Sequence, residues 1–298
     1  MIHTGLSPNT QKDDILLALS LLARPWRWRR HERVAEVEKM LAERLRVRHV
    51  AAVDSGRTAL YTILKALGIS EGDEVIVQGY TCVAVPEPVL WAHATPVYVD
   101  CGYDFTIDTE DLLRKITPAT KVIVAQHTFG MPAHMPEILA ITKQHDIFVI
   151  EDCAHALGGS HNGAPLGSLA DAAFFSFGRD KSLSSVFGGA IATNSDELNQ
   201  KVCSIIATYP LPSPLWVARQ LLHPVILSAA KRSYNIFGIG RILLALAREL
   251  HVISQAVEQK ELRGEMPSFV KHRFSPALAA LAQNQLKKLD RYTRHRRN

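Results

Sequence analysis

The chain reads Phe174-Phe-Ser-Phe-Gly-Arg-Asp-Lys181-Ser-Leu-Ser-Ser-Val-Phe-Gly-Gly189 in the stretch that says most about its fold. Residues 172–176 predict a short buried strand, and residues 189–193 predict a second strand behind a Gly-Gly turn. Lys181 lies in the loop between them. A lysine amine at this place can form a Schiff base with an aldehyde cofactor if it is held neutral, although most loop lysines are simply solvated. Lys181 is therefore a candidate that needs support from the rest of the chain.

Strands and helices alternate on both sides of this stretch. Short apolar strands are predicted at residues 50–53, 74–77, 95–99, 121–125 and 147–150. Helices are predicted at residues 32–46, 57–67, 84–92, 108–115 and 135–145. This alternation indicates an α/β fold in which helices cover both faces of a mainly parallel sheet. Ligands bind such sheets at the carboxyl ends of the strands, where this chain places polar residues.

The composition of the 298 residues is that of an ordinary globular protein, with 47% hydrophobic and 21% charged residues. It excludes a disordered chain and a disulfide-stapled miniprotein, and the length allows one large α/β domain or two smaller ones. The net charge of +5 is too small to indicate a partner. The basic segments 24–33 and 291–297 contain no helix-turn-helix or zinc module, so we expect no nucleic-acid binding.

The four cysteines are far apart and show no CxxC pair or metal-ligand spacing, so we expect no metal site. The apolar stretch at residues 15–23 follows acidic residues instead of basic ones, which is not the pattern of a secretory signal. No apolar run reaches the roughly 18 residues expected of a membrane-spanning helix. These features predict a cytoplasmic protein.

A second motif, Glu151-Asp-Cys-Ala-His155, follows the strand predicted at residues 147–150. A carboxylate just past a buried parallel strand can face a ligand, and Asp152 has this position. Pyridoxal phosphate needs such a carboxylate, because a protonated pyridine nitrogen makes its ring an electron sink. An aspartate here is also a common helix N-cap, and His155 could be a core histidine.

A third motif, Asp54-Ser-Gly56-Arg57-Thr58, connects a strand to a helix. The amide groups and the dipole at the start of a helix favour a bound phosphate. The motif is not a Walker loop and lacks GxGxxG, so it gives little support for a nucleotide. Ser-Gly before a helix is also ordinary turn chemistry.

Taken in order, the three motifs resemble the DegT/DnrJ/StrS family of pyridoxal-phosphate-dependent sugar aminotransferases. The resemblance covers roughly residues 32–205 and 268–298. Further segments that carry it are Gly72-Asp-Glu-Val, Gly79-Tyr-Thr, Ala94-Thr-Pro-Val-Tyr-Val-Asp100, His127-Thr-Phe-Gly130 and residues 273–286. It implies the large domain of the aspartate-aminotransferase fold, with a mainly parallel seven-stranded sheet, and a homodimer whose sites lie at the subunit interface.

The resemblance also implies a role for each matching residue. Lys181 would hold the cofactor as a Schiff base and would act as the catalytic base once it is displaced. Asp152 would pair with the pyridinium nitrogen, and His155 would contact the phenolic oxygen. Lysine at position 181 disfavours the family's dehydratases, which have histidine there.

The phosphate of the cofactor would be held by Ser176 and by the backbone of Gly56, Arg57 and Thr58. The Arg57 side chain, which departs from the family's usual residue, could add a charge-assisted bond. Cys82 stands where the family places an aromatic residue against the cofactor ring, with Tyr80 nearby as a substitute.

The activity implied by the resemblance is transfer of an amino group to a keto-sugar in amino-sugar or surface-glycan biosynthesis. The donor in the family is usually glutamate, and the acceptor is usually nucleotide-linked. Two alternatives remain open. One is a lyase or desulfurase-like enzyme, for which Cys82 is the only hint, and the other is a non-catalytic regulatory or membrane-associated protein of the same fold.

The chain is expected to contain four parts, which are an N-terminal arm (1–31), a cofactor-binding large domain (32–205), an apolar helical insertion (206–262) and the start of a small domain (263–298). We expect this small domain to be incomplete, either in a truncated piece or in a protein that has lost it.

Further helices are expected at residues 241–257 and 276–294. Residues 209–257 depart from the family pattern, and a helical subdomain is the simpler interpretation. Peripheral membrane contact through residues 15–30 and 209–257 is the alternative.

Overall fold

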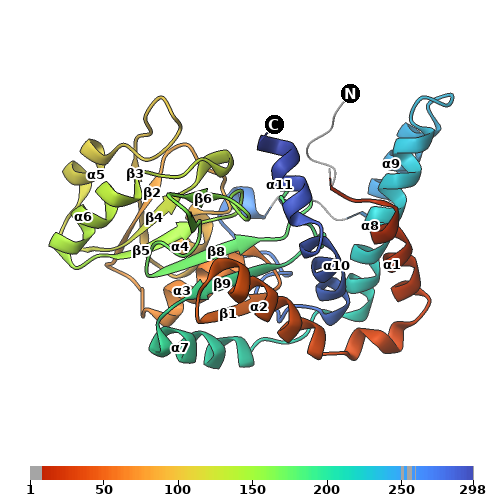
Figure 1. Cartoon of the computed structure of the whole chain (residues 1–298), viewed down its shortest axis with the longest axis horizontal. Coiled ribbons are helices and arrows are strands. Elements are labelled where there is room, and N and C mark those ends of the chain that lie inside the picture. Colours follow the sequence, from red (N-terminus) through yellow and green to blue (C-terminus); the bar gives the residue numbers. More distant parts are fainter. Residues whose placement is uncertain (1–8, 250–251, 254–256, 259, 298) are drawn as a thin grey trace.

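The computed structural model describes residues 9–249, 252–253, 257–258 and 260–297. Its centre is a seven-stranded sheet with the order β1-β9-β8-β5-β4-β2-β3 (Figure 1). The strands are β1 (His49–Val53), β2 (Glu74–Gln78), β3 (Thr95–Val99), β4 (Thr120–Gln126), β5 (Phe148–Asp152), β8 (Ala172–Ser176) and β9 (Gly189–Thr193). All neighbours pair in parallel except β9, which is antiparallel to both β1 and β8. The predicted mainly parallel seven-stranded α/β sheet is confirmed.

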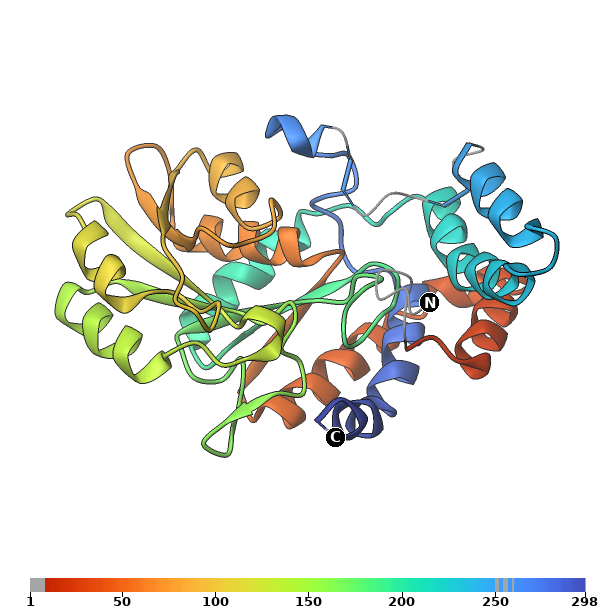
Figure 2. The same ribbon diagram turned by 90° about the horizontal axis from the view of Figure 1, so that it is seen from above.

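Helices cover both faces of this sheet, because its strands are apolar on both sides. Val75 and Val77 of β2 belong to one buried cluster, while Ile76 between them belongs to the cluster on the opposite face. Helices α3 and α4 lie on the first face, and α5 and α6 lie on the second (Figure 2). Their bounds are α2 (Glu32–Leu45), α3 (Gly56–Ala66), α4 (Pro86–Trp91), α5 (Thr109–Lys115), α6 (Met135–His145) and α7 (Asp196–Ala207). The helices expected at residues 32–145 are therefore confirmed to within two residues at each end.

The beginning and the end of the described chain lie side by side. Helix α1 (Lys12–Leu22) packs against α8 (Pro214–Ser233) and α10 (Pro276–Leu286), and α8 packs in turn against α9 (Ile239–Glu249) (Figure 1). A short 3₁₀ helix, η1 (Pro25–Arg29), links α1 to α2. The four-part division of the chain stays a prediction.

Two expected helices have different limits. The helix expected at residues 241–257 ends at Glu249 as α9, and Val252 and Ile253 are not helical. The other residues of that expected helix beyond Glu249, except Val257, lie outside the described residues. The helix expected at residues 276–294 is divided into α10 and α11 (Leu289–Arg297). Within the described part of the chain, no helix combines the length and the apolar character needed to cross a membrane.

A buried carboxylate ties α1 to the end of the chain. Asp14 is 3% exposed and accepts hydrogen bonds from Asn284 (2.7 Å), Gln285 (2.7 Å) and the Lys288 amine (2.8 Å). Asp13 lies on the same turn and also reaches Lys288, but its side chain is half-exposed.

We expect the substitution Asp14→Asn to lower the free energy of unfolding by about 2–3 kcal/mol, because loss of the charge leaves the buried Gln285 and the partly buried Asn284 and Lys288 without a carboxylate acceptor. The matched change Asp13→Asn is expected to cost less than about 1 kcal/mol, because the Asp13 side chain is half-exposed and Lys288 keeps its ion pair with Asp14. Urea denaturation of the two variants measures the difference. Equal losses would contradict the packing described for α1.

Candidate active site

One cavity of about 410 Å³ opens at the carboxyl ends of the parallel strands. Gln126, Asp152 and Ser176, the last residues of β4, β5 and β8, all line it. The start of α3 and the loop after β8 complete the wall. The cavity brings together Gly56, Arg57, Cys82, Asp152, His155, Ser176 and Lys181, all of them predicted site residues.

Lys181 lies in the loop that follows β8, and its side chain is largely buried. Its Nζ is 2.9 Å from Nε2 of His155 and 3.3 Å from a carboxylate oxygen of Asp180. Burial and then the positive charge of Lys181 lower the pKa of His155. The imidazole is therefore neutral, and its Nε2 accepts a hydrogen bond from the amine.

Asp152 is the last residue of β5, lines the same cavity and is 4% exposed. Burial raises the pKa of its carboxyl group, while the Ala154 N–H, which donates to Oδ1 at 2.9 Å, and the positive charge of Lys181 act in the opposite direction. A carboxyl group under such opposing influences is suited to hold or share a proton with a ligand nitrogen.

The start of α3 meets the end of β8. A Cβ atom added at Gly56 would lie only 3.1 Å from the Cβ of Ser176, so glycine allows the helix start and the strand end to approach. The first amide groups of a helix have no partner within the helix, and they favour an anion at this end. The part of the cavity between Ser176 and Gly56 could therefore hold an anion, and we call it the anion-binding corner.

Thr58 is the one predicted site residue that does not line the cavity. Its N–H donates to Oγ of Ser55, which caps the helix at 3.2 Å, so this amide is used within the protein. Its own hydroxyl accepts the N–H of Lys271 at 3.1 Å. Thr58 therefore fastens residue 271 to α3 and lies behind the anion-binding corner.

Arg57 lines the cavity, and its guanidinium is paired within the protein. It forms an ion pair with the fully buried carboxylate of Glu261 and lies 4.7 Å above the ring of Phe269. Glu87 of α4 also faces it, although burial still raises the pKa of Glu87 to about 7. Arg57 thus holds Glu261 and Phe269 against the start of α3, and Val257, which is close to Glu261 in the chain, forms part of the cavity wall.

Cys82 lines the cavity, as does Tyr80. Phe129 also lines the cavity, although the motif His127-Thr-Phe-Gly130 alone indicates no role for it. Its ring stacks on the imidazole of His155, with centroids 6.0 Å apart and planes 11° apart. Its backbone is left-handed (φ 54°), which is unusual for a bulky residue, and that conformation is not visible in the sequence.

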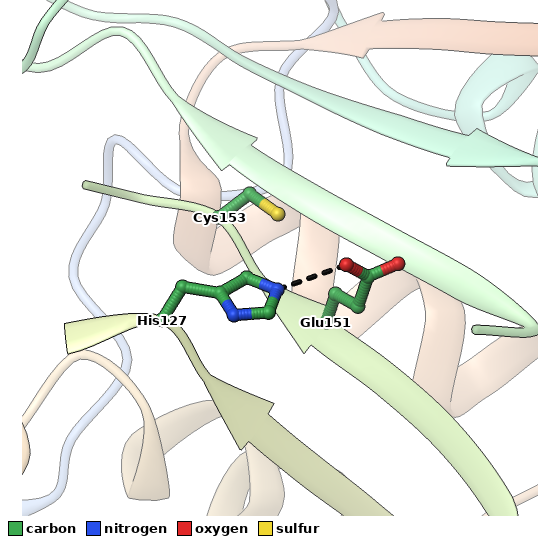
Figure 3. Close-up of side chains that lie close together, drawn as sticks. All are labelled: His127, Glu151 and Cys153. Atoms are coloured by element: carbon green, nitrogen blue, oxygen red, sulfur yellow. Dashed lines mark hydrogen bonds and ion pairs between the residues drawn. The ribbon is translucent and has the colours of Figure 1, made fainter. Parts of the chain in front are cut away.

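His127 lines the cavity and forms, with Glu151 and Cys153, a group whose potential metal-ligating atoms lie within 4.8 Å of one another (Figure 3). The Ala133 N–H donates to Nδ1 of His127 at 3.0 Å, so Nε2 carries the proton and donates to Glu151 at 2.9 Å. Three backbone amides of residues 167–170 donate to the same carboxylate. Because the imidazole and the carboxylate are already satisfied, the cluster is a structural network and not a metal site.

The chemistry of the cavity fits pyridoxal phosphate. That cofactor presents an aldehyde, a ring nitrogen and a phosphate, and the cavity offers a lysine amine, a buried carboxyl group and an anion-binding corner.

Comparison with known proteins identifies a family of aminotransferases. Residues 9–209 match the model of the DegT/DnrJ/EryC1/StrS aminotransferase family. The chain is 41% identical to a GDP-perosamine synthase of Caulobacter vibrioides over 57% of its own length and 46% of that protein. It is 43% identical to a UDP-N-acetyl-3-dehydro-alpha-D-glucosamine 3-aminotransferase of Acidithiobacillus ferrooxidans over 52% of its own length and 43% of that protein.

Among solved structures, an aminotransferase from Psychrobacter cryohalolentis superposes with a TM-score of 0.69 at 26% identity. The match covers 94% of this chain and 62% of that one. The chain therefore spans about half the length of the curated relatives it matches.

Proposed function

Because the chain belongs to the DegT/DnrJ/EryC1/StrS aminotransferase family, we propose that it is a pyridoxal-phosphate-dependent aminotransferase. One observation carries the proposal most directly. Lys181, His155 and Asp152 converge in a single cavity that also contains an anion-binding corner. The experiment that tests it is an amino-transfer assay of the purified chain with cofactor, in which formation of the amino product is followed for the wild type and for Lys181→Ala.

When bound, pyridoxal phosphate supplies an electron sink for the carbon that gains or loses the amino group. The residues of the chain have separate tasks. Asp152 would hold a proton at the ring nitrogen, and Gly56 and Ser176 would hold the phosphate. Lys181 would bind the aldehyde group of the cofactor, and its free Nζ would serve as the base that moves a proton at the reacting carbon. His155, whose Nε2 accepts from that amine, orients it.

The acceptor we propose is a keto-sugar linked to a nucleotide, with glutamate as the amino donor. The names of two relatives support this substrate class, since one is a GDP-perosamine synthase and the other acts on a UDP-linked dehydro-sugar. Product analysis distinguishes this reaction from the lyase or desulfurase-like alternative. An amino-sugar product supports the proposal, and release of sulfide or another eliminated group contradicts it.

A homodimer is part of the proposal, since the family works with sites at a subunit interface. Sedimentation velocity of the purified chain tests this state, and a monomer at micromolar concentration would contradict it. We further propose a cytoplasmic location.

We also propose that the α8–α9 connection touches an anionic membrane surface. This connection lies at the end of the molecule remote from the sheet (Figure 1). Phe237 at its tip is 97% exposed, and its exposed apolar neighbours are Ile236, Ile239, Ile242 and Leu246. The exposed cations Lys231, Arg232 and Arg241 lie in the same hairpin. Apolar side chains with flanking cations are typical of interfacial helices.

Liposome flotation tests this contact. The wild type is expected to float with vesicles that contain anionic lipid and to float less with neutral vesicles. The double substitution Phe237→Ser and Ile242→Ser is expected to reduce flotation by about tenfold or more, because it removes most of the apolar area that would be buried. Met131→Ser, which changes an apolar residue that is 51% exposed elsewhere on the surface, serves as the control. If the wild type stays with neither kind of vesicle, the contact does not exist.

A further inference from the structure

Three aromatic rings form an exposed surface at the mouth of the cavity. Tyr80, Phe105 and Phe129 are 48%, 47% and 65% exposed. Their ring centroids lie 5.4 Å (Tyr80 to Phe105), 6.3 Å (Tyr80 to Phe129) and 6.4 Å (Phe105 to Phe129) apart. These spacings are those of interacting aromatic pairs, so the rings make one continuous group, which we call the aromatic mouth.

Hydrogen bonds hold the backbone segments that carry the aromatic mouth in defined conformations. Phe105 and Phe129 both have left-handed backbone conformations, with φ of 61° and 54°. The side-chain amide of the buried Gln78 donates to the carbonyl oxygens of Tyr80 (3.0 Å) and Phe105 (2.9 Å). Bulky residues keep such unfavourable conformations only where the surrounding structure holds them, and here they present the rings to solvent.

A second set of bonds supports the same surface. The amide of Gln126, the last residue of β4, donates to the Tyr80 carbonyl at 3.2 Å and to the Thr128 hydroxyl at 2.8 Å. On the other side, Asp104 accepts the N–H of Thr106 at 3.0 Å and thereby fixes the turn that carries Phe105. Gln78 at the end of β2 and Gln126 at the end of β4 thus hold the backbone segments that carry the rings.

The aromatic mouth is continuous with the reacting centre. Phe129 stacks on His155, and His155 contacts the Lys181 amine at 2.9 Å. Phe105 does not line the cavity and lies at the outer end of the group. A ligand that places its reacting carbon at Lys181 and extends outward therefore passes across these rings.

We propose that the aromatic mouth is a stacking subsite for the planar base of a nucleotide-linked substrate, an inference that rests on the function proposed above. The three rings offer apolar faces and carry no charge, so the chemistry that they recognise is a flat aromatic ring and not a phosphate. Stacking tolerates different bases, because each base has a π face. The subsite would therefore contribute affinity for the nucleotide part of the substrate, with little selectivity between bases.

A ligand-observed NMR titration of the cofactor-loaded protein with UDP and with GDP tests the proposal. Saturation is expected to pass from the protein chiefly to the base protons of both nucleotides. Phe105→Ala is expected to weaken binding by about 5- to 150-fold, the usual effect of removing one stacking partner. Phe105→Tyr keeps a ring and is expected to restore binding. Tyr103→Ala removes a fully exposed aromatic residue two positions away and is expected to change nothing.

Several results would overturn the subsite. They are a wild type that binds neither nucleotide, saturation confined to ribose protons, and equal losses for the substitutions at positions 103 and 105. Conversion of a dimer to a monomer by Phe105→Ala would assign the aromatic mouth to a second copy of the chain instead. Nucleotide binding requires no turnover, so a protein that binds bases here but transfers no amino group would contradict the proposed function and leave the subsite intact.

Discussion

Replacement of Lys181 by Ala is expected to reduce amino transfer by about four orders of magnitude, because it removes both the covalent attachment and the proton-transferring amine. Lys181→Arg is expected to be almost as inactive, because a guanidinium keeps the charge but cannot act as the base. Rates of amino-product formation at saturating cofactor measure both effects.

The control for this prediction is another lysine. Lys201→Ala removes a half-exposed amine of α7 that pairs only with Glu197 among the described residues, and it is expected to leave the rate unchanged. Thermal unfolding of the three variants shows whether each is folded. A folded Lys181→Ala variant that retains more than about a tenth of the wild-type rate would remove Lys181 from the mechanism.

Asp152→Asn is expected to lower the rate of amino transfer by about a thousandfold, because an amide cannot hold the ring nitrogen in its protonated form. The free energy of unfolding is expected to increase in the same variant. Burial raises the folded-state pKa of Asp152, so ionisation of this group costs stability at pH values above its unfolded pKa. Asparagine removes that cost.

The matched variant is Glu151→Gln, one residue earlier on the same strand. Glu151 is fully buried and accepts bonds from His127 and from three backbone amides, so this change is expected to lower the free energy of unfolding by about 2–4 kcal/mol. Urea denaturation and activity assays of both variants separate the two roles. If Asp152→Asn loses stability but keeps its activity, Asp152 is structural and not functional.

The sheet could be predicted because its strands are short, apolar and regularly separated by helices. The local pattern and the buried packing agree there, and a strand such as β2 with Val75, Ile76 and Val77 has few other stable arrangements. Helix α8 was harder to predict. It continues through Pro224, which removes one backbone hydrogen bond, because packing against α1, α9 and α10 stabilises the helix.

The cavity could also be predicted, because Lys181, Asp152 and Gly56 follow strands whose ends meet at one edge of the sheet. Long-range contacts could not be predicted in this way. The partner of Arg57 is Glu261, which lies far along the chain, and nothing in the sequence near either residue indicates the ion pair. Thr58 matched a motif, but the cap made by Ser55 uses its amide. Phe129 needed a backbone conformation that sequence patterns do not show.

The central claim is that Lys181 holds pyridoxal phosphate as a Schiff base, and reductive trapping tests it most directly. The purified chain is incubated with pyridoxal phosphate and treated with borohydride, which reduces the carbon–nitrogen double bond to a stable amine. Peptide mapping by mass spectrometry then locates the label. We expect a single labelled peptide that carries the cofactor on Lys181. A folded protein that takes up no cofactor, or that carries it on another lysine, would contradict the account.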